Sequence, residues 1–188
     1  NRIYCRFCNG IYYIYDNTSS KMNYIGIDIG KSGYIVIISE NTIDKFAIPL
    51  IGDQVDIGEL ANYFRELDCT QSIVYMEDLH SIFGVSASSN YSFGWINGLF
   101  EGILKSFSIP YVKVQAKKWQ KEMFEGIPEQ IKISKARRKV DTKAMSILAS
   151  KRLFPSFDLR ISDRARVDNH NVSDALLLAA YAKKNYKL

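Results

Sequence analysis

The segment 24–33, Tyr-Ile-Gly-Ile-Asp-Ile-Gly-Lys-Ser-Gly, constrains the fold more than any other part of the chain. Apolar residues surround one aspartate, Asp28, and glycines close the segment, a pattern typical of a buried strand that ends in a tight turn. A buried carboxylate is costly unless it is paired or binds a cation. Asp28 is therefore either a strand-end carboxylate bonded by turn amides or a metal ligand, and the segment alone does not separate the two.

The charges of the chain are divided between its two halves. Residues 22–104 hold 3 basic and 11 acidic side chains, whereas residues 105–166 hold 16 basic and 6 acidic ones. This division suits a protein whose carboxylates hold cations while its lysines and arginines hold a polyanion such as a nucleic acid. Two ordinary solvated faces are the alternative, and charge alone does not exclude them.

The bulk composition predicts one folded domain. The 188 residues are 47% hydrophobic, enough for a full core, and no uncharged apolar run approaches the about 20 residues that cross a bilayer. We therefore expect no membrane association. Three cysteines argue against a disulfide framework, and no secretory signal is evident, so we expect an intracellular, reducing compartment.

Residues 1–21 differ in composition from the remainder, and we predict an N-terminal extension over 1–21 and the folded domain over 22–188. The extension is rich in tyrosine and contains Cys5 and Cys8. Their spacing fits half of a zinc site, but the sequence offers no second half. An unrelated extension or one short hairpin is the expected structure.

Strand patterns occupy 24–29, 34–39 and 42–48, and their short links require antiparallel pairing. A helix capped by Asp56 follows, and a fourth strand over 72–76 delivers Glu77 at its end. Because a strand that follows a helical crossover can lie parallel to the first strand, Asp28 and Glu77 would occupy neighbouring positions on one sheet.

The second half of the chain completes an α/β fold. The predicted elements are a loop (78–92), a helix (93–107), a strand (111–114), a helix (116–124), a loop (125–133), a basic helix (134–154), an irregular segment (156–171) and an apolar last helix (173–186). Glycines at 94, 98 and 102 predict close packing of the 93–107 helix against a sheet or another helix. The element order predicts a ribonuclease H-like fold, a five-stranded mixed sheet with three antiparallel strands and then parallel strands, flanked by helices.

This fold would bring four candidate ligands together at the ends of its elements. They are Asp28, Glu77, His170 and Asp174, of which the last two are four residues apart and share one helical face. Hard divalent cations prefer carboxylate oxygens, and two cations about 3.5–4 Å apart can assist phosphodiester hydrolysis. Taken singly, Asp174 fits a helix-start carboxylate and Glu77 a surface acid.

From Met22 onward the chain resembles the RuvC-type Holliday junction resolvases, especially their phage and plasmid-borne relatives. The motifs that carry the resemblance are Ile25-Gly26-Ile27-Asp28-Ile29-Gly30, Val74-Tyr75-Met76-Glu77, Ser88-Ser89-Asn90-Tyr91-Ser92-Phe93-Gly94-Trp95, Pro110…Val114-x-x-Lys117-Lys118-Trp119-Gln120-Lys121, Leu153-Phe154-Pro155 and Ser173-Asp174-Ala175-Leu176-Leu177-Leu178-Ala179. Each is weak alone, but their order and spacing together are fairly specific.

The resemblance implies a homodimeric crossover junction endodeoxyribonuclease that acts in DNA recombination and repair. It would cut two opposed strands of a four-way junction with Mg²⁺ or Mn²⁺, two ions per site, in the cytoplasm of a bacterium or of a phage- or virus-infected cell. By position, Asp28, Glu77 and Asp174 match the metal carboxylates of the family. For a fourth ligand we favour His170, with Asn171 as a helix cap and Asp168 as a further candidate.

The resemblance also indicates DNA contacts. Lys143 matches a basic position of the family and is expected to steady the charged phosphate, although an exposed helix lysine is the simpler interpretation. Where some relatives carry an aromatic wedge, this chain has His80, with Phe83 as the nearest aromatic residue. The basic residues expected to neutralise backbone phosphates are Lys117, Lys118, Lys121, Arg137 and Arg138.

Three other functions compete with a junction resolvase. One is a junction or nucleic-acid binding module with weak or no catalysis, which the histidine at an acid position favours. Another is a ribonuclease H-like nuclease that acts on flaps or RNA–DNA hybrids. The last is an actin-like ATPase or sugar kinase, which would need a second such domain and a second phosphate loop that we do not find in 188 residues.

Overall fold

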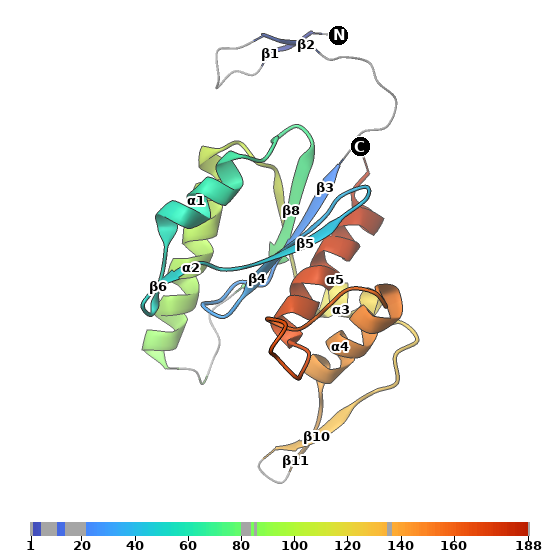
Figure 1. Ribbon diagram of the computed structural model, residues 1–188. Helices are drawn as coiled ribbons and strands as arrows, with labels where there is room; N and C mark the ends of the chain where they lie inside the picture. The colour runs from blue at the N-terminus through green and yellow to red at the C-terminus, as the bar shows by residue number, and fades with distance from the viewer. Residues whose placement is uncertain are drawn as a thin grey trace.

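The computed structural model describes residues 2–4, 11–13, 22–79, 84, 86–134 and 137–187, and its centre is a five-stranded sheet (Figure 1). The strand order is β5-β4-β3-β8-β9. The first three strands pair antiparallel, whereas β8 runs parallel to β3 and β9 runs parallel to β8. The strands are β3 (Asn23–Ile27), β4 (Tyr34–Ile38), β5 (Ile43–Ala47), β8 (Ser72–Glu77) and β9 (Tyr111–Val114).

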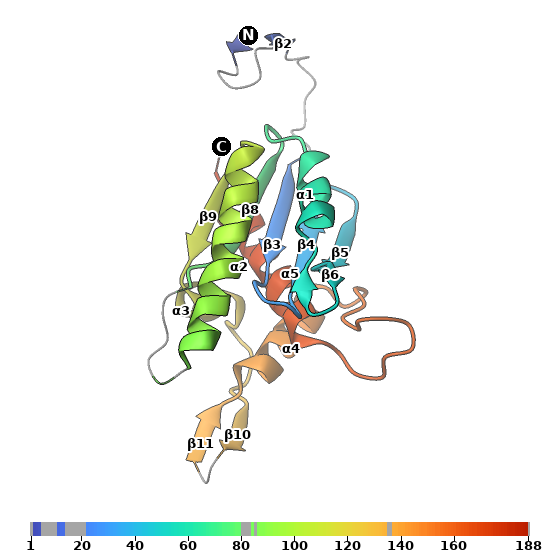
Figure 2. The same cartoon turned by 90° about the vertical axis from the view of Figure 1, so that its left-hand side faces the viewer.

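Helices cover both faces of this sheet (Figures 1 and 2). One face carries α1 (Ile57–Arg65) and α2 (Ala87–Ser106). The other carries α5 (His170–Asn185), with α3 (Ala116–Met123) and α4 (Thr142–Leu153) beside it. The predicted fold class is therefore confirmed: a mixed sheet with three antiparallel strands and then parallel strands, flanked by helices in a ribonuclease H-like topology.

Side chains of β3 alternate between two cores because successive residues of a strand face opposite sides of the sheet. Ile25 and Ile27 are fully buried in the core beneath α1 and α2, where Phe64 and Phe100 meet edge to face with ring centroids 6.2 Å apart. Tyr24 instead contacts the cores beneath α5. The apolar last helix thus packs on the sheet as predicted, and it begins at residue 170 rather than 173.

Gly26 lets the backbone of α5 rest directly on β3. A Cβ atom at this position would lie 2.0 Å from the carbonyl oxygen of Ala175 and 2.4 Å from the backbone nitrogen of Ala179. Backbone atoms cannot move aside as a flexible side chain can, so only glycine allows this approach. The contact lies two residues before Asp28 and one residue after Asp174, and it fixes the spacing of the elements that carry them.

The predicted loop over 78–92 is wrong in its second part, because α2 begins at Ala87. The serines that suggested a loop include the cap of this helix: the Ser86 hydroxyl oxygen accepts from the backbone N–H of Ser89 at 3.1 Å. The glycine row also differs from its prediction. No atom lies within 4 Å of a Cβ built at Gly94, Gly98 or Gly102, so the row packs on nothing in the described part of the chain.

The predicted basic helix over 134–154 is also wrong in its first part. A hairpin, β10 (Ile131–Ser134) and β11 (Arg137–Val140), precedes α4, which begins only at Thr142. Alternating isoleucines favour a strand here, and Asp141 then caps α4 by accepting from the backbone N–H of Ala144 at 3.4 Å. Arg137 and Arg138 therefore lie on a strand.

Two smaller hairpins complete the described secondary structure. β1 (Arg2–Tyr4) pairs antiparallel with β2 (Ile11–Tyr13) within the N-terminal extension, and β6 (Leu50–Ile51) pairs with β7 (Gln54–Val55) before α1. Cys5 and Cys8 lie outside the described residues. None of the described helices is long and apolar enough to cross a membrane.

The contact at Gly26 makes a testable prediction. We expect Gly26→Ala to lower the free energy of unfolding by about 3 kcal/mol or more, because the new methyl group meets backbone that cannot retreat. Gly58→Ala is the matched control: a Cβ at this exposed position in α1 would meet Oδ1 of Asp56 at an ordinary 3.5 Å, so the exchange should raise stability by about 0.5–1 kcal/mol. Urea denaturation followed by circular dichroism measures both, and a Gly26→Ala variant as stable as wild type would contradict the close approach.

Candidate active site

Three carboxylates meet at the carboxyl edge of the sheet, on the face that α5 covers. Ile27 of β3 pairs in parallel with Met76 of β8, so the next residues, Asp28 and Glu77, stand side by side. The alternation along each strand directs both toward α5. Asp174 lies in the first turn of α5, one residue before the contact with Gly26. The parallel register and the helix packing therefore place all three side chains on one side of the sheet, as the sequence predicts.

Burial and, for two of them, neighbouring negative charge raise the pKa values of the three carboxyl groups. Burial, followed by the negative charges of Asp174 and Glu77, raises the pKa of Asp28 to about 8. Burial also raises the pKa of Asp174 to about 7, with a further contribution from Glu77. The pKa of Glu77 is raised chiefly by burial. All three residues keep part of their surface in contact with solvent, so a cation from solution can reach them.

Two of the carboxylates are held by hydrogen bonds that the sequence analysis missed. The Ser146 hydroxyl of α4 donates to Oδ1 of Asp174, and the indole Nε1–H of Trp119 in α3 donates to Oε1 of Glu77 at 3.0 Å. Both bonds lower the pKa of their acceptor and so oppose the effect of burial. A buried tryptophan needs an acceptor for its N–H, which was the available signal for Trp119. Ser146 follows Lys143 by three residues and shares its helical face, which was the signal for Ser146.

The donor chemistry of this cluster fits a hard divalent cation, but its present geometry does not close around one. Half-buried carboxylates with raised pKa values gain from a nearby positive charge, and oxygen ligands are those that Mg²⁺ and Mn²⁺ prefer. Within the described residues, however, no three His, Cys, Asp or Glu side chains converge closely enough to hold one ion. Ser146 and Trp119 each engage one oxygen, of Asp174 and of Glu77 respectively, so ion binding would require the carboxylates to approach one another more closely.

Two of the three candidates for a fourth ligand, Asp168 and Asn171, are bonded to other groups in the structure. Asp168 forms an ion pair with Lys151 at 2.5 Å, and the side-chain N–H of Asn171 donates to the backbone oxygen of Ser32 at 2.8 Å. Asn171 is not the helix cap that we predicted. That role belongs to Asn169, whose Oδ1 accepts from the backbone N–H of Asn171 at 2.8 Å.

His170 is the first residue of α5 and lies one turn before Asp174 on the same helical face. Burial, followed by the positive charge of Lys143, lowers the pKa of His170. The imidazole is therefore neutral at pH 7, which is the form that can coordinate a metal ion. Its role as a ligand stays a prediction.

Lys143 faces this centre from the start of α4. Its charge lowers the pKa values of Asp28, Asp174 and His170, so it stands within electrostatic range of all three. The side chain is exposed, and its contact with a phosphate stays a prediction.

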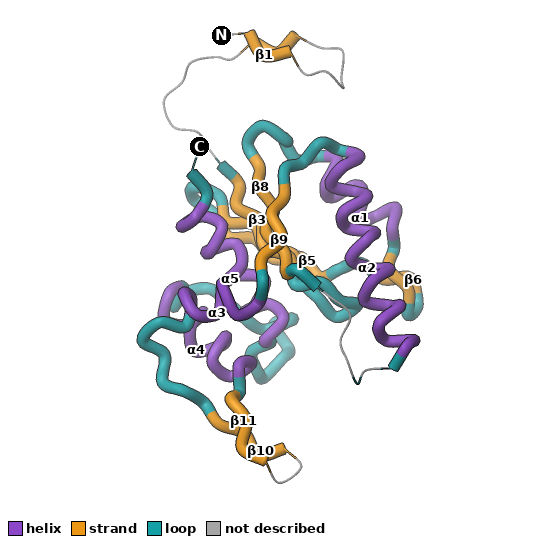
Figure 3. Tube along the Cα trace, turned by 180° about the vertical axis from the view of Figure 1, so that it is seen from behind, coloured by secondary structure: helices purple, strands orange, loops and turns teal. Residues whose placement is uncertain are grey.

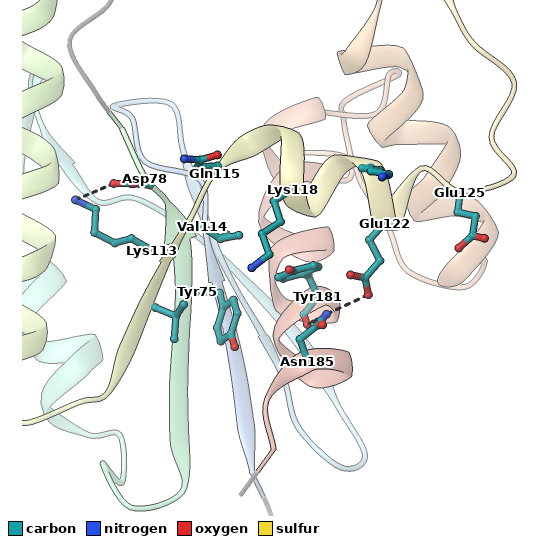
Figure 4. A pocket seen from close by; sticks show the side chains of 12 residues that line it. Tyr75, Asp78, Lys113, Val114, Gln115, Lys118, Glu122, Glu125, Tyr181 and Asn185 are labelled. Carbon is teal, nitrogen blue, oxygen red and sulfur yellow. Dashed lines mark hydrogen bonds and ion pairs between the residues drawn. The ribbon is translucent and has the colours of Figure 1, made fainter.

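Three of the predicted DNA contacts lie on α3. Lys117, Lys118 and Lys121 are exposed, and the last two line a cavity of about 1100 Å³ beside the edge strand β9 (Figure 4). Glu122 and Glu125 line the same cavity, so its charge is mixed. Their binding to DNA stays a prediction.

Two predicted contacts, the wedge residues His80 and Phe83, lie outside the described residues.

Comparison of the chain with protein-family models and with curated proteins gave no match. The function must therefore be inferred from the chemistry of this site.

The raised pKa values predict how stability depends on pH. A carboxyl group whose pKa is raised on folding stabilises the folded state at low pH, and that stabilisation is lost as pH rises from the unfolded value, 3.8, through about 8 for Asp28. In EDTA we expect Asp28→Asn to melt at a higher temperature than wild type at pH 8, with the difference vanishing near pH 4. Asp163→Asn, at an exposed position, is the control and should melt like wild type. If Asp28→Asn were no more stable than wild type at pH 8, the electrostatic strain would be absent.

Proposed function

We propose that this protein is a metal-dependent endodeoxyribonuclease that resolves four-way DNA junctions by paired phosphodiester hydrolysis. The observation that carries the proposal is the cluster of Asp28, Glu77 and Asp174 at the carboxyl edge of a ribonuclease H-like sheet. Burial raises all three pKa values, and neighbouring negative charge raises those of Asp28 and Asp174 further. The resemblance of the surrounding motifs to RuvC-type resolvases supplies the substrate class. The positive half of the chain suits a DNA partner.

The chain offers a defined set of groups for this chemistry. Asp28, Glu77 and Asp174, with His170, would hold one or two Mg²⁺ or Mn²⁺ ions, which when bound supply an activated water and stabilisation of the leaving 3′ oxygen. Lys143 would pair with the charged phosphate next to the carboxylates. Ser146 and Trp119 act on Asp174 and Glu77 and orient the oxygens that would face the ions.

A junction-binding module with weakened catalysis is the second candidate. It is favoured by one observation: the carboxylates of the described residues do not yet converge on a single ion-binding point. A nuclease that acts on flaps or RNA–DNA hybrids would use the same carboxylates, so only the substrate distinguishes it from a junction resolvase.

A cleavage experiment separates these candidates. Purified protein is incubated with a labelled synthetic four-way junction, a nicked flap, a linear duplex and an RNA–DNA hybrid, each with Mg²⁺, Mn²⁺ or EDTA. We expect metal-dependent, symmetrically paired cuts in the junction, and a loss of about 10²–10³-fold for Asp28→Asn because it removes a charged ligand. Asp163→Asn is the matched control and should cut like wild type.

Each result of this experiment has a distinct meaning. Cutting by Asp28→Asn at the wild-type rate would contradict the site. Binding without cutting in either metal would favour the binding module. Preferred cutting of the flap or the hybrid would replace the junction as substrate.

Paired cuts on opposed strands require two active sites, and we propose that a second copy of this chain docks on the outward face of α2. On this face the row of Gly94, Gly98 and Gly102 is open, and it lies beside Tyr91 and Trp95, which are 74% and 43% exposed. Small residues let two helices approach closely, and a two-fold axis places the same face on both partners.

The helix face yields a prediction about oligomeric state. Gly98→Lys places a long charged side chain in the glycine row without harming the helix, so we expect it to shift the protein from dimer to monomer. Gly58→Lys makes the same exchange at an exposed site in α1 and should leave the dimer intact. Sedimentation equilibrium measures the mass of each variant. A wild-type monomer, or a dimeric Gly98→Lys variant, would rule out this interface.

A further inference from the structure

The hairpin formed by β10 and β11 extends past the body of the protein at the end of the sheet that carries the carboxylates (Figures 1 and 3). Residues 131–140 contain five basic residues and no acidic one. A two-stranded hairpin is marginally stable on its own in water, so a projecting one gains from a partner. Its charge indicates that the partner is a polyanion.

The two faces of this hairpin differ. Cross-strand partners share a face, and the register pairs Ile131 with Val140, Ile133 with Arg138, and Lys132 with Lys139. Because faces alternate along a strand, the first two pairs share one face, which is apolar with one arginine, and the lysine pair lies on the other. Ile133 is 79% exposed, and Ile131 and Val140 are exposed as well. Nothing in the described part of the chain covers this apolar face.

A salt bridge fixes the hairpin to the helix that serves the active site. Lys132 Nζ bonds Oδ1 of Asp141 at 3.0 Å, and the backbone N–H of Asp141 donates to the oxygen of Gln130 at 2.7 Å. Asp141 also caps α4, the helix that brings Lys143 and Ser146 to the carboxylates. Lys132 is thereby engaged as an anchor, whereas Arg138 and Lys139 are exposed at the surface of the hairpin.

We propose that the β10–β11 hairpin is an arm that enters the major groove of a B-form DNA duplex leading into the cleavage site. The major groove is about 12 Å wide and admits a two-stranded ribbon. Arg138 and Lys139 would contact phosphates along the groove, and Ile133 would contact apolar base edges. This inference rests on the proposed nuclease function, and it adds the element that grips a duplex arm and holds it in register with the carboxylates.

Double-stranded RNA is the polyanion that the geometry disfavours. The major groove of an A-form helix is deep and narrow, and side chains cannot read it. A hairpin that enters a groove should therefore distinguish B-form DNA from A-form RNA, whereas a hairpin that merely attracts negative charge should not.

The test measures equilibrium binding of the full chain by fluorescence anisotropy in EDTA, where no cutting occurs. The probes are a labelled DNA duplex, a four-way junction and an RNA duplex of the same sequence, each at several salt concentrations. For Arg138→Ala/Lys139→Ala we expect weaker DNA binding and a salt slope reduced by about 2, one for each lost phosphate contact. Lys183→Ala/Lys187→Ala, at the far end of α5, removes two exposed lysines as a control and should bind like wild type.

A second variant tests the apolar face. Ile133→Ser should lower DNA affinity about tenfold without changing the salt slope, because it removes apolar contact and no charge. Because Ile133 is exposed, the Ile133→Ser variant should melt at the wild-type temperature, so weaker DNA binding by this variant cannot be assigned to unfolding.

Several results would overturn the inference. They are wild-type DNA affinity and salt slope in Arg138→Ala/Lys139→Ala, wild-type affinity in Ile133→Ser, or equal losses on DNA and RNA. Failure of the arm and failure of the nuclease are distinguishable, because binding is measured in EDTA and cutting in metal. Wild-type binding by the hairpin variants together with metal-dependent cutting refutes only the arm. Groove binding without cutting supports the arm and refutes the nuclease.

Discussion

The packing of the α5 backbone on Gly26 is the contact on which the candidate site depends. It sets the distance between the last helix and the first strand of the sheet, and only the absence of a side chain at position 26 permits that distance. Asp28 follows this contact by two residues, and Asp174 precedes Ala175 on the helix. The parallel pairing of β3 with β8 then adds Glu77 as the neighbour of Asp28. Three residues that are far apart in sequence thus meet through one close approach and one strand register.

The same arrangement sets function against stability. The fold keeps three carboxyl groups half-buried next to one another, which raises their pKa values and makes the charged state costly. Lys143, Ser146 and Trp119 offset part of this cost. Under the proposed function, bound cations would offset more of this cost. Asp141 links this site to the hairpin, because one carboxylate both caps α4 and pairs with Lys132.

Features with a local cause could be predicted from the sequence, whereas those with a tertiary cause could not. The apolar pattern around Asp28 predicted the first strand of the sheet, and the apolar character of the last helix predicted that this helix packs on a core. The order of the elements along the chain then predicted the fold. The sequence misled where residues have two uses. Serines near 86 favour loops but also cap helices. The basic residues at 132 and 137–139 suit helices, but they stand here on two strands, the first of which has alternating isoleucines. The bonds from Ser146 to Asp174 and from Trp119 to Glu77 span 28 and 42 residues, so local patterns could mark Ser146 and Trp119 as donors but could not identify their acceptors.

The most direct test of the central claim is to locate bound Mn²⁺ by anomalous scattering in crystals of this protein. Our account predicts that one or two ions lie between the carboxylates of Asp28, Glu77 and Asp174, with the side chains turned inward from their ion-free positions. It also predicts that these peaks disappear in crystals of Asp28→Asn prepared in the same way. Ions at other places only, or no ion among these three residues at millimolar Mn²⁺, would contradict it.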